Sequence, residues 1–232
     1  MNIRTPLIAS SLIAASLTSG AAQAALIGRD LNGSPGSFEA YYDDDFNITW
    51  LANANVNGQM TWDDANTWAA NLSFTDGVNT YDNWRLPTAL NQDGTGPCVL
   101  INCTDSEMGH LFFSELGGTL GQSIFTSSDP DLTKFINLQE GEYWSGTEAG
   151  FIDGGDGIPI FDDSKAWFFG FNTGLQGPFP KESALYALAV SPGDVGAVPG
   201  DDDDDVTAVP EPATLLLVGL GLVGLGAIRR RG

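Results

Sequence analysis

The sequence predicts an α+β domain that lies between two export signals, and three observations support this expectation. Two segments in the first half of the chain have apolar side chains at helical spacing. Short apolar or aromatic runs bounded by Gly, Pro and Asp follow them, and such runs are typical of antiparallel strands. An apolar segment flanked by arginine lies near each end of the chain, as in membrane-targeting signals.

Residues 1–24 form the first signal. Arg4 supplies its positive charge, and the residues from Pro6 to Leu17 are apolar or small. Ala22-Gln23-Ala24 matches a small-residue cleavage site, so we expect cleavage before Ala25. The apolar stretch is short for a membrane span, which favours a cleaved signal peptide over an anchor or a buried helix.

The body between the signals has the length of one domain, 25–192, followed by an acidic spacer at 193–208. Residues 25–208 contain five basic and 29 acidic residues, a formal charge of −24. Such a polyanion is repelled by nucleic acid and by anionic polysaccharide or lipid, whereas neutral sugars, cations and basic partners stay open. Large aromatic side chains argue for a globular fold because they bury much apolar surface: Trp50, Trp62, Trp68, Trp84, Trp144 and Trp167.

The first predicted elements are a strand and a helix. The residues from Phe46 to Leu51 alternate in character and include β-branched and aromatic side chains, which predicts a strand. A helix is expected over 61–72, because Thr61 can cap it and Asp64 stands at the third position. Its apolar face consists of Trp62, Ala65, Trp68, Ala69 and Leu72.

An extended corner, a second helix and three strands follow. Trp84-Arg85-Leu86-Pro87 forms the corner, because the proline disfavours helix at the residue before it. The second helix is expected from Ser106 to Leu116 and ends at Gly117-Gly118. Its inward residues are Met108, Leu111, Phe112 and Leu116, and the later strands are expected at Tyr143 to Thr147, Ala166 to Asn172 and Leu185 to Val190.

The last 24 residues, 209–232, form the second signal and follow an aspartate run from Asp201 to Asp205. The apolar segment 213–228 would cover about 24 Å as a helix, short of the roughly 30 Å hydrocarbon core. The three closing arginines should stay on the cytoplasmic side. We therefore expect a transient anchor in the inner membrane, with an ordinary tail anchor as the alternative.

This tail resembles the PEP-CTERM sorting signal, and the matching residues are Val209, Pro210, Glu211, Pro212, Arg229, Arg230 and Arg231. The resemblance implies processing by an exosortase-type membrane enzyme in a Gram-negative bacterium that makes exopolysaccharide. The chain would then reach the cell surface or the extracellular matrix.

The body contains a series of short motifs rich in tryptophan: Ile48-Thr49-Trp50-Leu51, Thr61-Trp62-Asp63-Asp64-Ala65, Asn83-Trp84-Arg85-Leu86-Pro87-Thr88, Tyr143-Trp144-Ser145-Gly146-Thr147, Ala166-Trp167-Phe168-Phe169 and Ala189-Val190-Ser191-Pro192-Gly193-Asp194. In these motifs and their order the chain resembles the Lcl C-terminal-domain-like proteins. The resemblance implies a C-type-lectin-like fold with two helices and a mainly antiparallel sheet, and in some members adhesion to sulfated glycans. The charge of this chain argues against anionic glycans.

Cys98 and Cys103 are separated by four residues, and in an oxidising compartment such a pair favours a small-loop disulfide over free thiols. A metal site at the cysteines would need further ligands, and the chain has a single histidine, His110. We expect that histidine to lie at the surface or to cap the second helix, because no nucleophile elbow or oxyanion loop accompanies it.

Two further features could bind ligands. Arg85 could clamp a ligand carboxylate or hydroxyl, but we expect it to form an ion pair with a carboxylate such as Asp82 or Glu107 that supports the fold. Calcium is the small ligand that best fits the acidic loops, which contain Asp153, Asp156, Asp162 and Asp163 and, separately, Asp43, Asp44 and Asp45. Neither loop follows an EF-hand pattern, so a solvated acidic loop without cofactor is the alternative.

The sequence therefore predicts a non-enzymatic surface or biofilm-matrix protein that binds exopolysaccharide or another protein. The alternatives are an extracellular enzyme, either a matrix hydrolase or a relative of formylglycine-type oxidases, and a purely structural matrix component.

Overall fold

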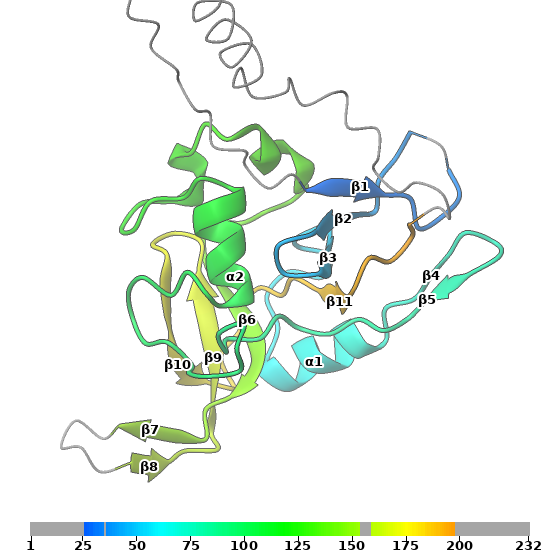
Figure 1. Ribbon diagram of the computed structural model, residues 1–232. Helices are drawn as coiled ribbons and strands as arrows, with labels where there is room; N and C mark the ends of the chain where they lie inside the picture. Colours follow the sequence, from blue (N-terminus) through cyan, green and yellow to red (C-terminus); the bar gives the residue numbers. More distant parts are fainter. Residues whose placement is uncertain (1–25, 35, 154–158, 198–232) are drawn as a thin grey trace, which may run out of the picture.

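The computed structural model describes residues 26–34, 36–153 and 159–197, with the side chains of 151–161 excepted (Figure 1). The strands are β1 (Ile27–Arg29), β2 (Ala40–Asp43), β3 (Ile48–Leu51), β4 (Phe74–Thr75), β5 (Thr80–Tyr81), β6 (Glu142–Glu148), β7 (Phe151–Asp153), β8 (Pro159–Phe161), β9 (Lys165–Gly170), β10 (Leu175–Pro180) and β11 (Val190–Pro192). The helices are α1 (Trp62–Ala70) and α2 (Glu107–His110), with a π-helical turn at Leu111–Glu115 and 3-10 turns at Ile124–Thr126 and Pro130–Lys134.

Two antiparallel sheets form the framework of the domain. One has the order β1-β2-β3-β11 and the other the order β10-β9-β6, while β4-β5 and β7-β8 are separate hairpins. The described part of the chain is thus mostly sheet with two short helices, which agrees with the expected α+β class. The more specific C-type-lectin-like fold stays a prediction.

Helix α1 forms where the sequence predicts it. The Thr61 side chain accepts a hydrogen bond from the backbone N–H of Asp64, and its hydroxyl contacts the Asp64 carboxylate at 2.8 Å. This cap satisfies the Asp64 N–H, one of the donors that the first turn of a helix leaves without partners. Ala65 and Ala69 are fully buried, so the helix packs closely against the domain at these two positions.

The second helix is shorter than expected because it changes its winding. The Ser106 side chain accepts from the backbone N–H of Gly109, and four α-helical residues follow. The next turn is π-helical, and the Leu116 N–H donates to the Leu111 carbonyl over 2.9 Å. The four predicted inward residues, Met108, Leu111, Phe112 and Leu116, are all fully buried.

The strand expected from Leu185 to Val190 is wrong in extent. Leu185 pairs only with Met60, and Tyr186 pairs with Tyr143, before the regular strand β11 begins at Val190. Because this segment crosses from one sheet to the other, its backbone changes partner at nearly every residue.

The core fills the space between the two sheets and the helices. Its largest fully buried side chains are aromatic, and Trp50, Trp144, Tyr143, Phe112, Phe169 and Phe171 head the set. Among the residues that the structure describes, no helix is long and apolar enough to cross a membrane. The expected signal peptide at 1–24 and the membrane segment at 213–228 lie outside those residues.

Candidate functional site: a surface groove, an ion-paired corner and a buried acidic cluster

An open groove of about 570 Å³ lies where the β2-β3 sheet meets the chain after α1. We call it the Phe38 groove, and its lining residues are Ser37, Phe38, Glu39, Leu51, Ala52, Asn53, Val56, Leu72, Ser73, Phe74 and Ile136. Three of its apolar side chains are about half exposed: Phe38 at 52%, Val56 at 46% and Ile136 at 56%. Water therefore reaches an apolar surface that has an aromatic ring at its edge.

The Phe38 ring is held in place by its surroundings. A Cβ atom on Gly28, in β1, would lie 2.5 Å from the ring, so only glycine lets the ring lie this close to the strand. The ring also meets Tyr41 edge to face, with centroids 6.1 Å apart. The groove thus presents its aromatic edge in a fixed orientation.

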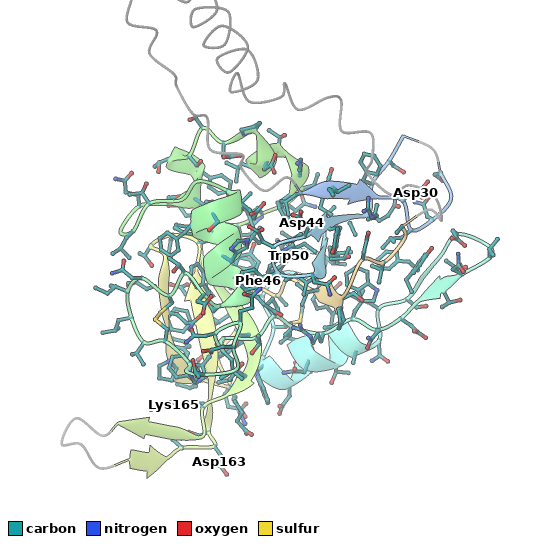
Figure 2. The ribbon with its side chains drawn as sticks, viewed as in Figure 1. Asp30, Asp44, Phe46, Trp50, Asp163 and Lys165 are labelled. Atoms are coloured by element: carbon teal, nitrogen blue, oxygen red, sulfur yellow. A yellow bond between two sulfur atoms is a disulfide. The ribbon has the colours of Figure 1, made fainter. Side chains whose placement is uncertain are left out.

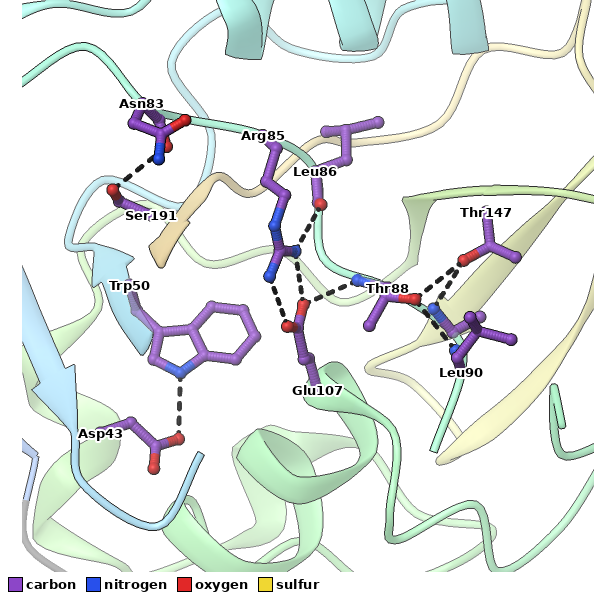
Figure 3. A network of polar contacts seen from close by, with 11 residues as sticks. Asp43, Trp50, Asn83, Arg85, Leu86, Thr88, Leu90, Glu107, Thr147 and Ser191 are labelled. Atoms are coloured by element: carbon purple, nitrogen blue, oxygen red, sulfur yellow. Dashed lines mark hydrogen bonds and ion pairs between the residues drawn. The ribbon is translucent and has the colours of Figure 1, made fainter. Parts of the chain in front are cut away.

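The Trp84-Arg85-Leu86-Pro87 corner is built around an ion pair (Figure 3). The Arg85 guanidinium contacts Glu107 twice, with Nη2–Oε1 at 2.6 Å and Nη1–Oε2 at 2.8 Å. The same carboxylate accepts the Thr88 backbone N–H at 2.7 Å, and Arg85 donates to the Leu86 carbonyl at 3.0 Å. The hydrogen bond to Glu107 raises the pKa of Arg85. Of the two acidic partners expected from the sequence, the structure thus selects Glu107 over Asp82.

A cavity of about 210 Å³ adjoins this corner and exposes one side of Arg85, whose side chain is 39% accessible. Its lining residues are Asn66, Arg85, Leu86, Thr88, Gly146 and Thr147. The guanidinium is already engaged by a carboxylate that is only 8% accessible, which fits a role in the fold.

His110 was expected at the surface or as a cap of the second helix, but its side chain packs against the β2-β3 hairpin and is 9% exposed. The side chain makes no cap hydrogen bond to the helical turn that follows. Its Nε2 lies 3.1 Å from Oε1 of Glu115 and 3.7 Å from Oδ1 of Asp43. Asp45 approaches the same nitrogen at 3.8 Å. The Phe46 ring stacks on the imidazole with centroids 4.2 Å apart. Phe46 and Trp50 mark this region in Figure 2.

Burial and charge act against each other in this cluster. Desolvation lowers the pKa of His110, but Glu115, Asp43 and Asp45 together outweigh it and raise that pKa above its ordinary value. Burial raises the pKa of Asp43, against the lowering effect of His110 and of the hydrogen bond from Trp50. Among the described residues, Asp43, His110 and Glu115 each offer a ligand atom, and these atoms all lie within 4.8 Å of one another.

The acidic loops expected to bind calcium are only partly described. Asp156 and the side chain of Asp153 lie outside the described residues. Asp162 pairs with Lys165 at 3.0 Å, and it accepts hydrogen bonds from the backbone N–H and the hydroxyl of Ser164. The hydrogen bond from the Ser164 hydroxyl lowers the pKa of Asp162. Asp163 is exposed, and it lies near Lys165 at the base of the β7-β8 arm (Figure 2).

The two cysteines form the expected disulfide. Cys98 and Cys103 are bonded, with their Cα atoms 5.4 Å apart. The loop between them is anchored to β10, because the Leu100 N–H donates to the Gln176 carbonyl at 2.8 Å. Gln176 is itself buried and donates to the carbonyls of Cys98 and Ala89.

The sequence did not indicate the Phe38 groove or the involvement of Glu115. The groove is assembled from four separate segments, so no motif marks it. Glu115 stands five positions after His110, a spacing that a regular α-helix does not bring onto one face. The sequence marks the aspartates at 43–45 and the single histidine as separate features, and only the fold brings them together.

Residues 208–231 match the PEP-CTERM protein-sorting motif. They include all the sorting residues proposed from the sequence, from Val209 to Arg231, and lie outside the described residues. A search of curated proteins finds no match to the chain. The motif indicates an exported protein that is held transiently in the membrane by its C-terminal tail and sorted by an exosortase.

Proposed function

We propose that the domain is a non-enzymatic binding module of the extracellular matrix, and that the Phe38 groove holds an uncharged polysaccharide. The observation that supports this most directly is the half-exposed Phe38 ring at the edge of an open, apolar groove. Sugar rings present apolar C–H faces that pack on aromatic rings, while their hydroxyls need polar partners at the rim. Ser37, Asn53 and Ser73 supply such partners.

The charge of the chain favours a neutral ligand. The body carries a formal charge of −24, so sulfated or uronic-acid polymers meet a repulsive field. Of the described residues that line the groove, Glu39 alone is charged. Its carboxylate accepts from the Leu31 N–H, the Asn32 amide and the Ser37 hydroxyl, and it is therefore fixed as part of the groove wall.

The alternative of an enzyme is less well supported. A hydrolase of this kind would need a carboxylic acid with a perturbed pKa at the place where the ligand binds. Among the described residues, the carboxyl with a raised pKa is that of Asp43, which is 1% exposed and does not line the groove. The proposal of a binder therefore agrees better with the placement of the acidic groups.

Binding of neutral and sulfated polysaccharides to the purified chain tests the proposal. We expect neutral polymers alone to bind, and Phe38→Ala to weaken binding about 2- to 13-fold, because an aromatic contact contributes about 0.5–1.5 kcal/mol. Phe125→Ala is the matched control, since that ring is 50% exposed but does not line the groove. A preference for sulfated polymers, or equal losses in both variants, would overturn the assignment.

A further inference from the structure

The second feature that the fold creates is the cluster of Asp43, His110 and Glu115, and it is independent of the groove. We propose that these three side chains bind one divalent transition-metal ion, with Zn²⁺ as the best fit. The site would join the β2-β3 hairpin to the π-helical turn after α2.

The spacing of the ligand atoms fits such an ion. At a tetrahedral zinc, bonds of about 2.0–2.1 Å place neighbouring ligand atoms about 3.3 Å apart. His110 Nε2 lies 3.1 Å from Glu115 Oε1 and 3.7 Å from Asp43 Oδ1, which brackets that value. All three ligand atoms lie within 4.8 Å of one another, so an ion between the three groups requires the carboxylates to move inward by side-chain rotation.

Three buried polar atoms of the cluster have no hydrogen-bond partner. They are Nε2 of His110 and both carboxylate oxygens of Glu115, in residues that are 7% and 1% exposed. A buried carboxylate without an aligned hydrogen bond is costly, because it has lost its water and has only the neighbouring imidazole as a partner. The contact between Nε2 and Oε1 is short but lacks hydrogen-bond alignment. A cation between these atoms would satisfy all three.

The surroundings hold the ligands as in established metal sites. The Trp50 indole N–H donates to Oδ2 of Asp43 at 3.2 Å (Figure 3). The other oxygen, Oδ1, lies 3.7 Å from His110 Nε2. The Phe46 backbone N–H also donates to Oδ1, at 3.1 Å, and its ring packs flat on the imidazole. Outer contacts of this kind fix the orientation of ligands and strengthen metal binding.

Asp45 offers both a fourth ligand and a route from solvent. Its Oδ2 lies 3.8 Å from His110 Nε2, and its side chain is 57% exposed. The site is therefore only one side chain below the surface. A nitrogen ligand among carboxylates favours zinc or a neighbouring transition metal, whereas Ca²⁺ prefers oxygen ligands alone.

Cobalt substitution tests the proposal on the full-length chain, purified in mild detergent and stripped with a chelator. Co²⁺ occupies zinc sites and gives visible d–d absorption when the coordination is tetrahedral. We expect this absorption to saturate at one ion per chain and to disappear on addition of Zn²⁺ but not of Ca²⁺. Thiolate-to-cobalt charge transfer should be missing, because both cysteines are in the disulfide.

Variants separate this site from nonspecific binding to acidic segments. His110→Gln and Glu115→Gln should each weaken Co²⁺ binding more than about 100-fold, since loss of an outer contact alone costs about 10- to 100-fold. Asp44→Asn, an exposed neighbour outside the cluster, should leave binding unchanged. Circular dichroism checks that each variant is folded.

A wild-type chain without the d–d bands at millimolar Co²⁺ would overturn the proposal by itself, whatever the variants do. Bands that persist in both glutamine variants would overturn it as well. In either case the cluster would be a buried ion network in which an imidazolium proton takes the place of the metal.

Discussion

Removal of Arg85 gives a sharp test of how the corner is held. In Arg85→Ala, the Glu107 carboxylate would stay buried with the Thr88 N–H as the remaining partner among its described contacts. Breaking a buried ion pair by removing one partner costs about 3–5 kcal/mol. Because the Arg85 side chain is 39% exposed, water offsets part of this, and we expect about 2–3 kcal/mol.

Such a loss corresponds to a fall in Tm of about 4–12 °C for a domain of this size. Tryptophan fluorescence or near-UV circular dichroism during heating measures it. The double variant Arg85→Ala/Glu107→Ala should be more stable than the sum of the two single losses predicts, by about 0.5–3 kcal/mol, because no unpaired charge is left.

Lys165→Ala is the matched control, since it breaks a pair at 3.0 Å whose carboxylate is more exposed, Asp162 at 22% against 8% for Glu107. It should cost no more than about 1 kcal/mol. If Arg85→Ala retains full stability, or loses no more than Lys165→Ala, the corner does not depend on the ion pair, and Arg85 becomes available as a ligand clamp.

Three further predictions follow from single features. The Cys98–Cys103 disulfide closes a short loop with a sequence separation of 5, so the double variant Cys98→Ser/Cys103→Ser should lower the free energy of unfolding by about 2 kcal/mol. Peptide mapping that finds both thiols open to alkylation would contradict the bond. Asp76 accepts hydrogen bonds from the backbone N–H and side chain of Asn79, from the Tyr81 hydroxyl and from the Val78 N–H, which hold its pKa well below 3.8. The ionised Asp76 therefore contributes its full stability above its unfolded-state pKa, and this contribution is lost as the pH falls through its pKa in the folded protein. An NMR titration should find this carboxyl still ionised at pH 3.8. Deletion of Pro210–Pro212 should leave a full-length, membrane-bound precursor on immunoblots of cell fractions, and normal trimming of that variant would show that another segment is the sorting signal.

Local features of the fold were predictable from the sequence because their causes are local. Thr61 and Asp64 cap α1 within one turn, and the apolar spacing of the second helix correctly gives its four buried side chains. The change to a π-helical turn was not predictable, since no residue in Leu111–Glu115 requires it. That turn is what brings Glu115 to His110, so the cluster could not be derived from helical periodicity.

Contacts between distant segments could not be predicted from the sequence, because they depend on tertiary packing. The sequence predicts Asp82 or Glu107 as the ion-pair partner of Arg85. Glu107 lies 22 positions away along the chain, so tertiary packing decides between the two carboxylates. The Phe38 groove has no sequence signature at all, because its wall includes Ile136 from far along the chain. The predicted surface position of His110 was wrong. A polar residue on a helix is usually exposed, whereas here Asp43 and Phe46 cover the imidazole.

The sheet β1-β2-β3-β11 joins the first described strand to the last, and this has a kinetic consequence for export. Arg29 bonds to Asp194 at 2.6 and 2.8 Å across 165 residues, and Thr49 accepts the Val195 N–H at 3.2 Å. A chain that crosses the membrane amino terminus first cannot complete this sheet until nearly the whole domain has emerged. Closing contacts between such distant segments is slow, so we expect the pairing of β3 with β11 to form late, after nearly the whole domain has crossed.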